Sequence, residues 1–413
     1  MPEPDILHVG VAVYMYRRHL EERRKARRRY WVKPWMTRRP NYGHYHTLLR
    51  ELELENPEDF KEYMRMEPAM FYEILQRVTP RITKKDTNFR KSLEPGLKLA
   101  ITLRFLASGD SYRSLKFNFR VSHNAISAFI PEVCGAILDE YYNAATLPKS
   151  EDEWKETAKM FWNRWNLPHC LGAIDGKHIA MKQPAHSGTL YHNYKGFFSM
   201  ILLGVVDADY RFTWVVIGAN GSTSDCAVFN VCDLKEGIEN GSLHVPEADS
   251  LPKSDMKFPY FLVGDDAFPL KDWLLKPFSS RQLTEEERIY NYRISRARRI
   301  VENGFGILAN RFRCLLGTLQ IKPDNVSSVV LACVCLHNVM RARYPTLQNR
   351  DLDKELEDGT YIPGSWRMEA LMHDIEAQKA PTPASRTAKK NRVMMKHYVN
   401  QIGTVPWQWN IIH

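Results

Sequence analysis

The sequence lacks the features that most directly assign a chain to the membrane, to secretion or to a zinc-binding class. It has no run of eighteen or more apolar residues and no hydrophobic signal-peptide core, so we expect neither a membrane span nor secretion. Its seven cysteines form no Cys-x-x-Cys pair and no cysteine–histidine zinc spacing. They therefore predict buried, reduced thiols of an intracellular protein. No internal repeat is visible either.

The chain does contain enough apolar residues for a sizeable core, together with an excess of positive charge. Of its 413 residues, 44% are hydrophobic and 11% aromatic, which suits one large domain or two to three smaller ones. The net charge of +10 favours a polyanionic partner. A basic cluster near the N-terminus predicts a nucleic-acid-binding arm or a nuclear-import signal, with a solvated helix face or a disordered basic tail as the alternative. The cluster comprises Arg17, Arg18, Arg23, Arg24, Lys25, Arg27, Arg28, Arg29, Lys33, Arg38 and Arg39.

The pattern of apolar residues divides the chain into four parts. Residues 1–60 form the basic arm, and residues 61–150 show helical periodicity. Residues 160–345 change to short apolar runs that end at glycine or aspartate, which is typical of strands, followed by two long helices. Residues 346–413 are polar and charged, which predicts a flexible or loosely packed tail. The expected strands cover 170–181, 198–207, 211–218 and 260–263, and the expected long helices cover 288–312 and 326–343.

Within the helical region, residues 111–142 have the pattern of a helix-turn-helix. A short helix is expected from Ser111 to Phe119, followed by a tight turn and a longer helix capped by Ser122. The first outward residues of this second helix would lie where recognition helices contact bases, and an ordinary helical bundle is the alternative. The candidate DNA-reading residues are His123, Asn124 and Ser127.

Two carboxylates follow apolar runs that are expected to be neighbouring strands. Residues 171–174 lead into Asp175, and residues 261–264 lead into Asp265 and Asp266. A carboxylate at the rim of a buried strand needs water, a partner or a cation, because leaving it bare is costly. Glycine beside each aspartate allows a ligand to approach the backbone closely. If the strands are adjacent in one sheet, the two carboxylates lie together.

Glu302 is expected to add a third carboxylate from the helix at 288–312. The apolar residues of this helix form one stripe, and Glu302 lies at its edge, near the small residues Gly306 and Ala309. Three such carboxylates suit two Mg²⁺ or Mn²⁺ ions, which can activate a nucleophile and stabilise the leaving oxygen of a phosphodiester. Taken singly, each residue has a simpler explanation. Asp175 could form a turn, Asp265 could cap a helix, and Glu302 could be an ion-pair partner of Arg298.

Four ordered segments resemble the PIF/Harbinger transposase superfamily: GAIDGKHI, YKGFFSMILLGVVDADYRFTWVVIGANGSTSDCAVF, FLVGDDAFPL and RRIVENGFGILANRFRCL. The resemblance implies an α/β fold with a ribonuclease-H-like mixed sheet flanked by helices, preceded by the all-helical module. It also implies that Asp175, Asp265 and Glu302 are the metal-binding DDE triad of a Mg²⁺-dependent transposase. The second motif reads Gly-Asp-Asp-Ala-Phe where other members have Gly-Asp-Ser-Gly-Tyr, so Asp266 is the alternative to Asp265.

The same resemblance implies cleavage at transposon ends and transfer of the 3′-hydroxyl to target DNA. It further implies a nuclear location (cytoplasmic without its partner), a Myb/SANT-like partner protein, and a dimer or larger assembly on DNA. A domesticated descendant that binds DNA or chromatin without transposing is one alternative. A metal-dependent nuclease that cuts without joining strands is another.

Basic residues near the four segments are candidate phosphate contacts, which would give affinity that weakens with salt. The alternatives are surface solubility, ion pairs such as Arg298 with Glu302 and, for His178, a structural hydrogen bond. The candidates are Lys177, His178, Lys195, Arg298, Arg299, Arg311 and Arg313.

Overall fold

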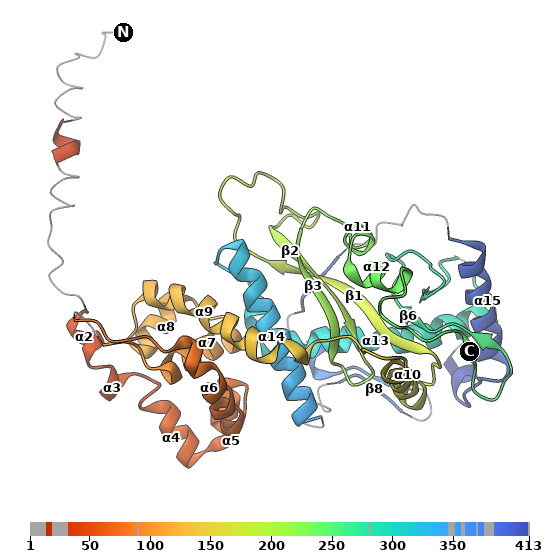
Figure 1. Ribbon diagram of the computed structural model, residues 1–413, viewed down its shortest axis with the longest axis horizontal. Helices are drawn as coiled ribbons and strands as arrows, with labels where there is room; N and C mark the ends of the chain where they lie inside the picture. Colours follow the sequence, from red (N-terminus) through yellow and green to blue (C-terminus); the bar gives the residue numbers. More distant parts are fainter. Residues whose placement is uncertain are drawn as a thin grey trace, which may run out of the picture.

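The computed structural model places a helical N-terminal module beside an α/β core (Figure 1). Residues 1–13 and 19–31 of the predicted basic arm lie outside the described residues. The structure describes residues 14–18, 32–88, 91–280, 282–345, 352–356, 360–368, 371–375 and 384–411.

The N-terminal module is helical, as its apolar periodicity predicts. Ser111 and Ser122 cap the last two helices, where their side chains accept backbone N–H groups of Ser114 and Ala125. These two helices meet at 102°, and Arg120, directly after the first of them, has a left-handed backbone conformation with φ 53°. The helices are α2 (Pro34–Thr37), α3 (Arg39–Tyr42), α4 (Leu48–Glu55), α5 (Pro57–Met64), α6 (Pro68–Ile82), α7 (Pro95–Ser108), α8 (Tyr112–Phe119) and α9 (His123–Tyr141).

The core is built on a mixed sheet in the order β3-β2-β1-β6-β7. The first three strands are antiparallel, whereas β6 and β7 run parallel to β1. The predicted strands agree with the observed ones to within two residues at each end, so the predicted mixed sheet is confirmed. The strands are β1 (Cys170–Ala180), β2 (Ser199–Val206), β3 (Phe212–Asn220), β6 (Phe261–Val263) and β7 (Leu274–Leu275), with a separate hairpin of β4 (Asp249–Ser250) and β5 (Lys257–Phe258).

Helices cover both faces of this sheet. Alternate strand residues point to opposite faces; Leu202 joins the core cluster that contains α13 and α14, whereas Leu203 joins the cluster that contains α11 and α12. Thr284 and Glu287 form a capping box at the start of α13, which fixes where this long helix begins. The helices are α10 (Glu151–Trp165), α11 (Asp225–Asn230), α12 (Asp233–Glu239), α13 (Glu285–Arg311) and α14 (Pro323–Arg343), with short 3₁₀ turns at η1 (Tyr142–Ala144) and η2 (Arg313–Leu315).

Among the described residues, α14 is long and apolar enough to cross a membrane by length and composition alone, and so is the bent α8–α9 pair taken together. In the structure, however, α14 packs against α9 and β3. Its apolar side chains belong to the main hydrophobic cluster, which is the environment of a core helix. The seven cysteines are also buried and free, as predicted.

The prediction of a loosely packed tail after residue 345 is wrong for the described residues. Strand β10 pairs antiparallel with β1 at Lys177 and His178. Helix α15 packs along α13 and buries Met395 and Tyr398. The polar composition suggested loose packing, but these short elements attach through a few large side chains and many polar contacts. The elements are β8 (Lys354–Glu355), β9 (Tyr361–Ile362), η3 (Ser365–Met368), β10 (His373–Asp374), α15 (Arg386–Asn400) and η4 (Gln408–Ile411).

Candidate active site

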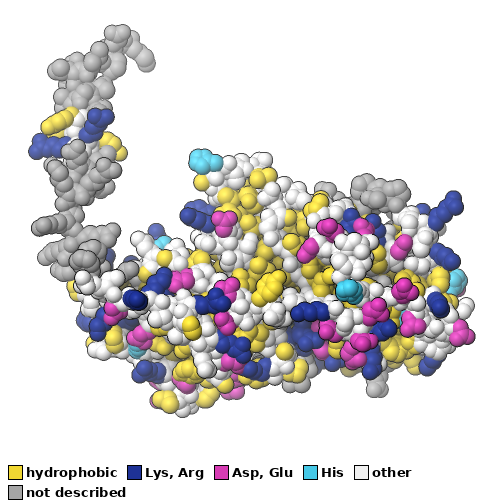
Figure 2. Space-filling model, in the orientation of Figure 1, with side chains coloured by type: hydrophobic (Ala, Val, Ile, Leu, Met, Phe, Trp, Pro, Cys, Tyr) yellow, Lys and Arg dark blue, Asp and Glu magenta, His cyan; other side chains and the backbone are white. Residues whose placement is uncertain are grey.

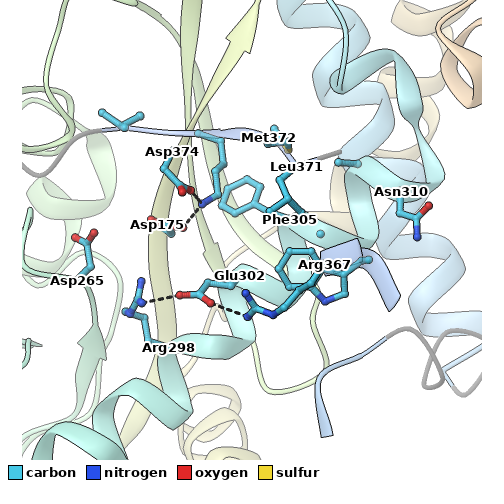
Figure 3. Close-up of a pocket in the computed structure, with 15 residues that line it drawn as sticks. Asp175, Asp265, Arg298, Glu302, Phe305, Asn310, Arg367, Leu371, Met372 and Asp374 are labelled. Carbon is cyan, nitrogen blue, oxygen red and sulfur yellow. Dashed lines mark hydrogen bonds and ion pairs between the residues drawn. The ribbon is translucent and has the colours of Figure 1, made fainter. Parts of the chain in front are cut away.

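The three carboxylates predicted from the sequence line one pocket of about 330 Å³ between the sheet and α13 (Figure 3). Asp175 comes from β1, Asp265 from the loop after β6, and Glu302 from α13. Three cations and a fourth carboxylate share the pocket. They are Lys177, Arg298, Arg367 and Asp374.

Asp175 lies inside β1 and not at its end, yet one edge of the strand is open beside it. On one side, its backbone pairs with Gly204 of β2. On the other side, the parallel partner β6 ends opposite Ala173, and the antiparallel β10 ends opposite Lys177. Asp175 is 6% exposed and lies at this break in strand pairing. The break explains how a carboxylate in the middle of a buried strand reaches the pocket.

Asp265 is close enough to Asp175 for the two charges to repel. Burial raises the pKa of Asp265, and the neighbouring Asp175 raises it further. One oxygen accepts the N–H of Ala267 at 2.9 Å, and no ion pair to Asp265 occurs among the described residues. Asp266 instead forms an ion pair with Lys276 at 3.0 Å and does not line the pocket. The position of Asp265 therefore matches the choice made from the sequence register.

The other two carboxylates are neutralised by protein cations. Arg298 Nη2 lies 2.6 Å from Glu302 Oε1, and Arg367 Nη2 lies 2.9 Å from Oε2 (Figure 3). Lys177 Nζ lies 2.8 Å from Asp175 Oδ2 and also contacts Asp374. Burial alone would lower the pKa of Lys177, but these two aspartates raise it more, so the ammonium remains charged.

The oxygen-only donor set fits hard divalent cations such as Mg²⁺ and Mn²⁺. The repulsion between Asp175 and Asp265 indicates local excess negative charge that such a cation would relieve. Across the described residues, however, no three His, Cys, Asp or Glu side chains are already gathered as a metal site. Binding a metal at Glu302 therefore requires the carboxylate to exchange at least one guanidinium contact.

Four of the predicted DNA contacts are exposed. His123, Asn124 and Ser127 lie on the first turns of α9, and Lys195 lies in the loop before β2. On the face shown in Figure 2, Lys and Arg alternate with Asp and Glu over both the module and the core. Net charge alone therefore does not locate a DNA surface on that face.

Other predicted contacts have internal roles instead. His178 is 1% exposed and hydrogen bonds through Nδ1 to Ser199 Oγ at 3.0 Å. Burial lowers its pKa to about 4, so the neutral ring offers no positive charge to DNA. Arg299 pairs with Glu355 of β8, and Arg311 is buried. Arg313 is partly exposed beside the N-terminal module. For His178, Arg299 and Arg311 the structure thus corresponds to the alternative interpretation, in which they have structural contacts.

Sequence reasoning missed one partly exposed cluster in the N-terminal module, which we call the aromatic–cationic patch: Trp35, Tyr42, Phe117, Lys116 and Arg120. The Trp35 and Phe117 rings stack at 5.8 Å, and Lys116 Nζ lies 4.6 Å from the Phe117 centroid. Arg120 lies over both Trp35 and Tyr42. Phe117 is 62% exposed although the inner face of α8 is already filled. The signal available in the sequence was Phe117, an aromatic residue that lies off the apolar stripe of its helix.

Comparison with known proteins defines the class of this fold and site. Residues 174–338 match the family model described as DDE superfamily endonuclease, and this span contains Asp175, Asp265 and Glu302. The mixed sheet flanked by helices fits such a nuclease fold.

Similarity to individual proteins extends over a longer stretch. The chain is 28% identical over 304 residues to "Putative nuclease HARBI1" of Rattus norvegicus, covering 72% of this chain and 82% of the relative. The Homo sapiens protein of the same name is 28% identical over 306 residues, with the same coverage. "Protein ALP1-like" of Arabidopsis thaliana is 28% identical over 293 residues, covering 69% and 71%. The resemblance indicated by the four motifs is therefore confirmed, because these matches support a relationship of the chain to the Harbinger-type DDE transposase-derived proteins.

Proposed function

We propose that the protein is a DNA transposase that cleaves phosphodiesters at transposon ends and joins the new 3′-hydroxyl to target DNA, using two Mg²⁺ or Mn²⁺ ions. The observation that carries this proposal is the meeting of all three acidic residues in one pocket, with none replaced by a non-acidic side chain. An intact set of carboxylates is what metal-dependent phosphodiester chemistry needs.

The roles of the residues follow from their positions. Asp175 and Asp265, whose charges repel, would hold metal between them, and Glu302 would complete the site. Bound metal ions would activate the attacking water or 3′-hydroxyl and stabilise the leaving oxygen. The ion pair of Lys177 with Asp175 would hold this carboxylate in position. Arg298 is partly exposed, so once it leaves Glu302 its guanidinium would contact a DNA phosphate.

The N-terminal module is the proposed DNA-positioning part. Helices α8 and α9 meet at 102°, within the range of helix-turn-helix pairs. In a helix-turn-helix, the exposed residues at the start of α9 would be the base-reading residues. The aromatic–cationic patch next to them combines positive charge with exposed rings, which suits phosphates and unpaired bases. Its two cations Lys116 and Arg120, and Arg38 over the Tyr42 ring, have no carboxylate partner among the described residues.

Phe117→Ala is expected to weaken DNA binding by about fivefold or more, because a base–aromatic stack contributes about 1–3 kcal/mol. Tyr142→Ala is the matched control, since Tyr142 is 73% exposed and follows the far end of the 19-residue α9. Fluorescence anisotropy with a labelled hairpin that carries an unpaired strand measures both variants. Equal affinities for Phe117→Ala and wild type would remove the patch from the DNA surface.

The proposal also includes a nuclear location and a Myb/SANT-like partner that helps recognise the ends. It further includes a dimer or higher assembly that brings two ends together. They are what excision and joining of chromosomal DNA would require.

A second candidate function is DNA cleavage without strand joining, in a domesticated descendant. It is favoured by the mammalian relatives, whose name describes a nuclease and not a transposase. A DNA- or chromatin-binding descendant without catalysis is the weaker form of the same alternative, because the three carboxylates are present.

The test uses labelled DNA with the terminal inverted repeats that flank the gene, a target plasmid, and Mg²⁺ or Mn²⁺, with and without a Myb-like partner. Cleavage at the ends together with joined products supports the transposase. Cleavage without joined products supports the nuclease. Binding without cleavage under any of these conditions overturns both catalytic proposals.

A further inference from the structure

The C-terminal segment 353–374 lies outside the part of the chain that matches the family model, yet it contributes to the pocket. We propose that Arg367 is a positioning residue of the active site: fixed by Asp353, its guanidinium orients the Glu302 carboxylate for metal binding. This inference rests on the proposed function, because it takes Glu302 to be a metal ligand.

Arg367 is held rigidly by contacts other than Glu302. Its Nε donates to Asp353 Oδ1 at 2.9 Å, and its Nη2 donates to Oδ2 at 2.7 Å. The Asp353 side chain is 3% exposed and also accepts the N–H of Gly364 at 2.8 Å. The guanidinium lies over the Trp366 ring at 4.3 Å. A two-point contact with a buried carboxylate fixes the plane of the guanidinium, and Nη2 is then directed at Glu302 Oε2 (Figure 3).

The helix residues around Glu302 are shaped to receive this segment. The Asn303 side-chain oxygen accepts both the N–H of Asp353 at 3.1 Å and the indole Nε1–H of Trp366 at 2.8 Å. Asn303 is 1% exposed. One turn after Glu302, a Cβ added to Gly306 would overlap the Trp366 ring. The segment therefore docks on the same turn of α13 that carries Glu302. Its position and that of the Glu302 carboxylate are linked.

The second guanidinium that contacts Glu302, that of Arg298, is not held by other polar contacts among the described residues. Arg298 lies one helical turn before Glu302, and among the described residues the ion pair with Glu302 is its one polar contact. Its side chain is 25% exposed and free to leave. Oε1 is therefore the oxygen that can be released to a metal. Because a carboxylate oxygen accepts more than one partner, Oε2 can keep its hydrogen bond from Arg367 while Glu302 binds metal. Hydrogen-bonded partners of this kind orient metal ligands and affect affinity.

The test is direct titration with Mn²⁺, following the free ion by electron paramagnetic resonance, so that the readout is independent of cleavage. Arg367→Gln is expected to weaken Mn²⁺ binding by about 10- to 100-fold. Arg367→Lys keeps the charge but loses the two-point contact with Asp353, and we expect it to recover little of the affinity. Arg298→Gln removes a cation that competes with the metal, and we expect equal or tighter Mn²⁺ binding.

The matched control is Arg299→Gln. Arg299 also joins α13 to the C-terminal segment, through Glu355, but it does not line the pocket. Mn²⁺ affinity within about twofold of wild type for this variant, together with the loss for Arg367→Gln and Arg367→Lys, supports the proposal.

Unchanged or tighter Mn²⁺ binding by Arg367→Gln overturns the proposal, because Arg367 would then be an inert contact or a competing cation. An equal loss in Arg299→Gln also overturns it, since general loosening of the segment would explain both. If wild type binds no Mn²⁺, or Asp265→Asn binds it as well as wild type, the proposed function itself fails. That result is separate from any effect of Arg367.

Discussion

Asp265→Asn is expected to reduce metal-dependent DNA cleavage by at least about a thousandfold, whereas Asp266→Asn should stay within a few-fold of wild type. Metal ions contribute several kcal/mol to phosphodiester chemistry, and each 1.36 kcal/mol corresponds to a factor of about ten in rate. Asp265 lines the pocket beside Asp175, while Asp266 pairs with Lys276 outside it. Adjacent residues of the same type thus provide a matched pair of substitutions.

Asp175→Asn and Glu302→Gln should reduce metal-dependent DNA cleavage to the same extent as Asp265→Asn. Cleavage of end-labelled DNA is measured at saturating Mn²⁺, after thermal unfolding shows that each variant is folded. This check matters most for Glu302, which is bound by two arginines. Loss of cleavage in Asp266→Asn but not in Asp265→Asn would show that the register of the second motif is shifted by one residue.

Arg293→Met is expected to lower the free energy of unfolding by about 3 kcal/mol or more. Arg293 is fully buried on α13 and donates to Gly403 O at 2.9 Å, to Gln408 Oε1 at 3.0 Å and to Asn166 O. Removal of the guanidinium takes one donor from each of these three acceptors, and each acceptor left unsatisfied costs about 1–3 kcal/mol. Gln408 Oε1 keeps the N–H of Val405 at 3.2 Å. The pKa of Arg293 is lowered to about 10 by burial, so the group is still charged at neutral pH.

Urea denaturation monitored by tryptophan fluorescence measures this change. The control is Arg81→Met, because Arg81 is about half exposed and forms surface ion pairs with Asp139 and Glu140. Such pairs contribute about 0–1 kcal/mol. If Arg293→Met costs no more than Arg81→Met, the turn after α15 is not part of the cooperatively folded core, and the packed C-terminal region described above would be loosely held.

The sequence was informative wherever function or fold depends on local order along the chain. The four strands could be located because buried strands appear as short apolar runs that end at Gly or Asp. Ser111 and Ser122 could be identified as caps because a serine before an apolar helix satisfies free N–H groups. Asp175, Asp265 and Glu302 could be named because they stand in ordered motifs, and the shared pocket followed from sheet adjacency.

The partners of those carboxylates could not be predicted in the same way. Arg367 and Asp374 reach the pocket from a polar segment more than sixty residues after Glu302 in the chain, and no periodic pattern marks them. Lys177, His178 and Arg299 lie within the motifs, which suggested DNA contacts, yet each side chain has a partner within the fold. Proximity in sequence does not say which way a side chain points.

By itself, then, the sequence determined four strands of the sheet, the two long helices and the three candidate acidic residues, because these depend on local apolar spacing and on motif order. Only the tertiary structure decided that Asp175 lies at a break between β6 and β10, and that Glu302 is held between Arg298 and Arg367. Those facts depend on long-range pairing of short polar segments, whose stability comes from burial against α13 and not from any propensity of their own.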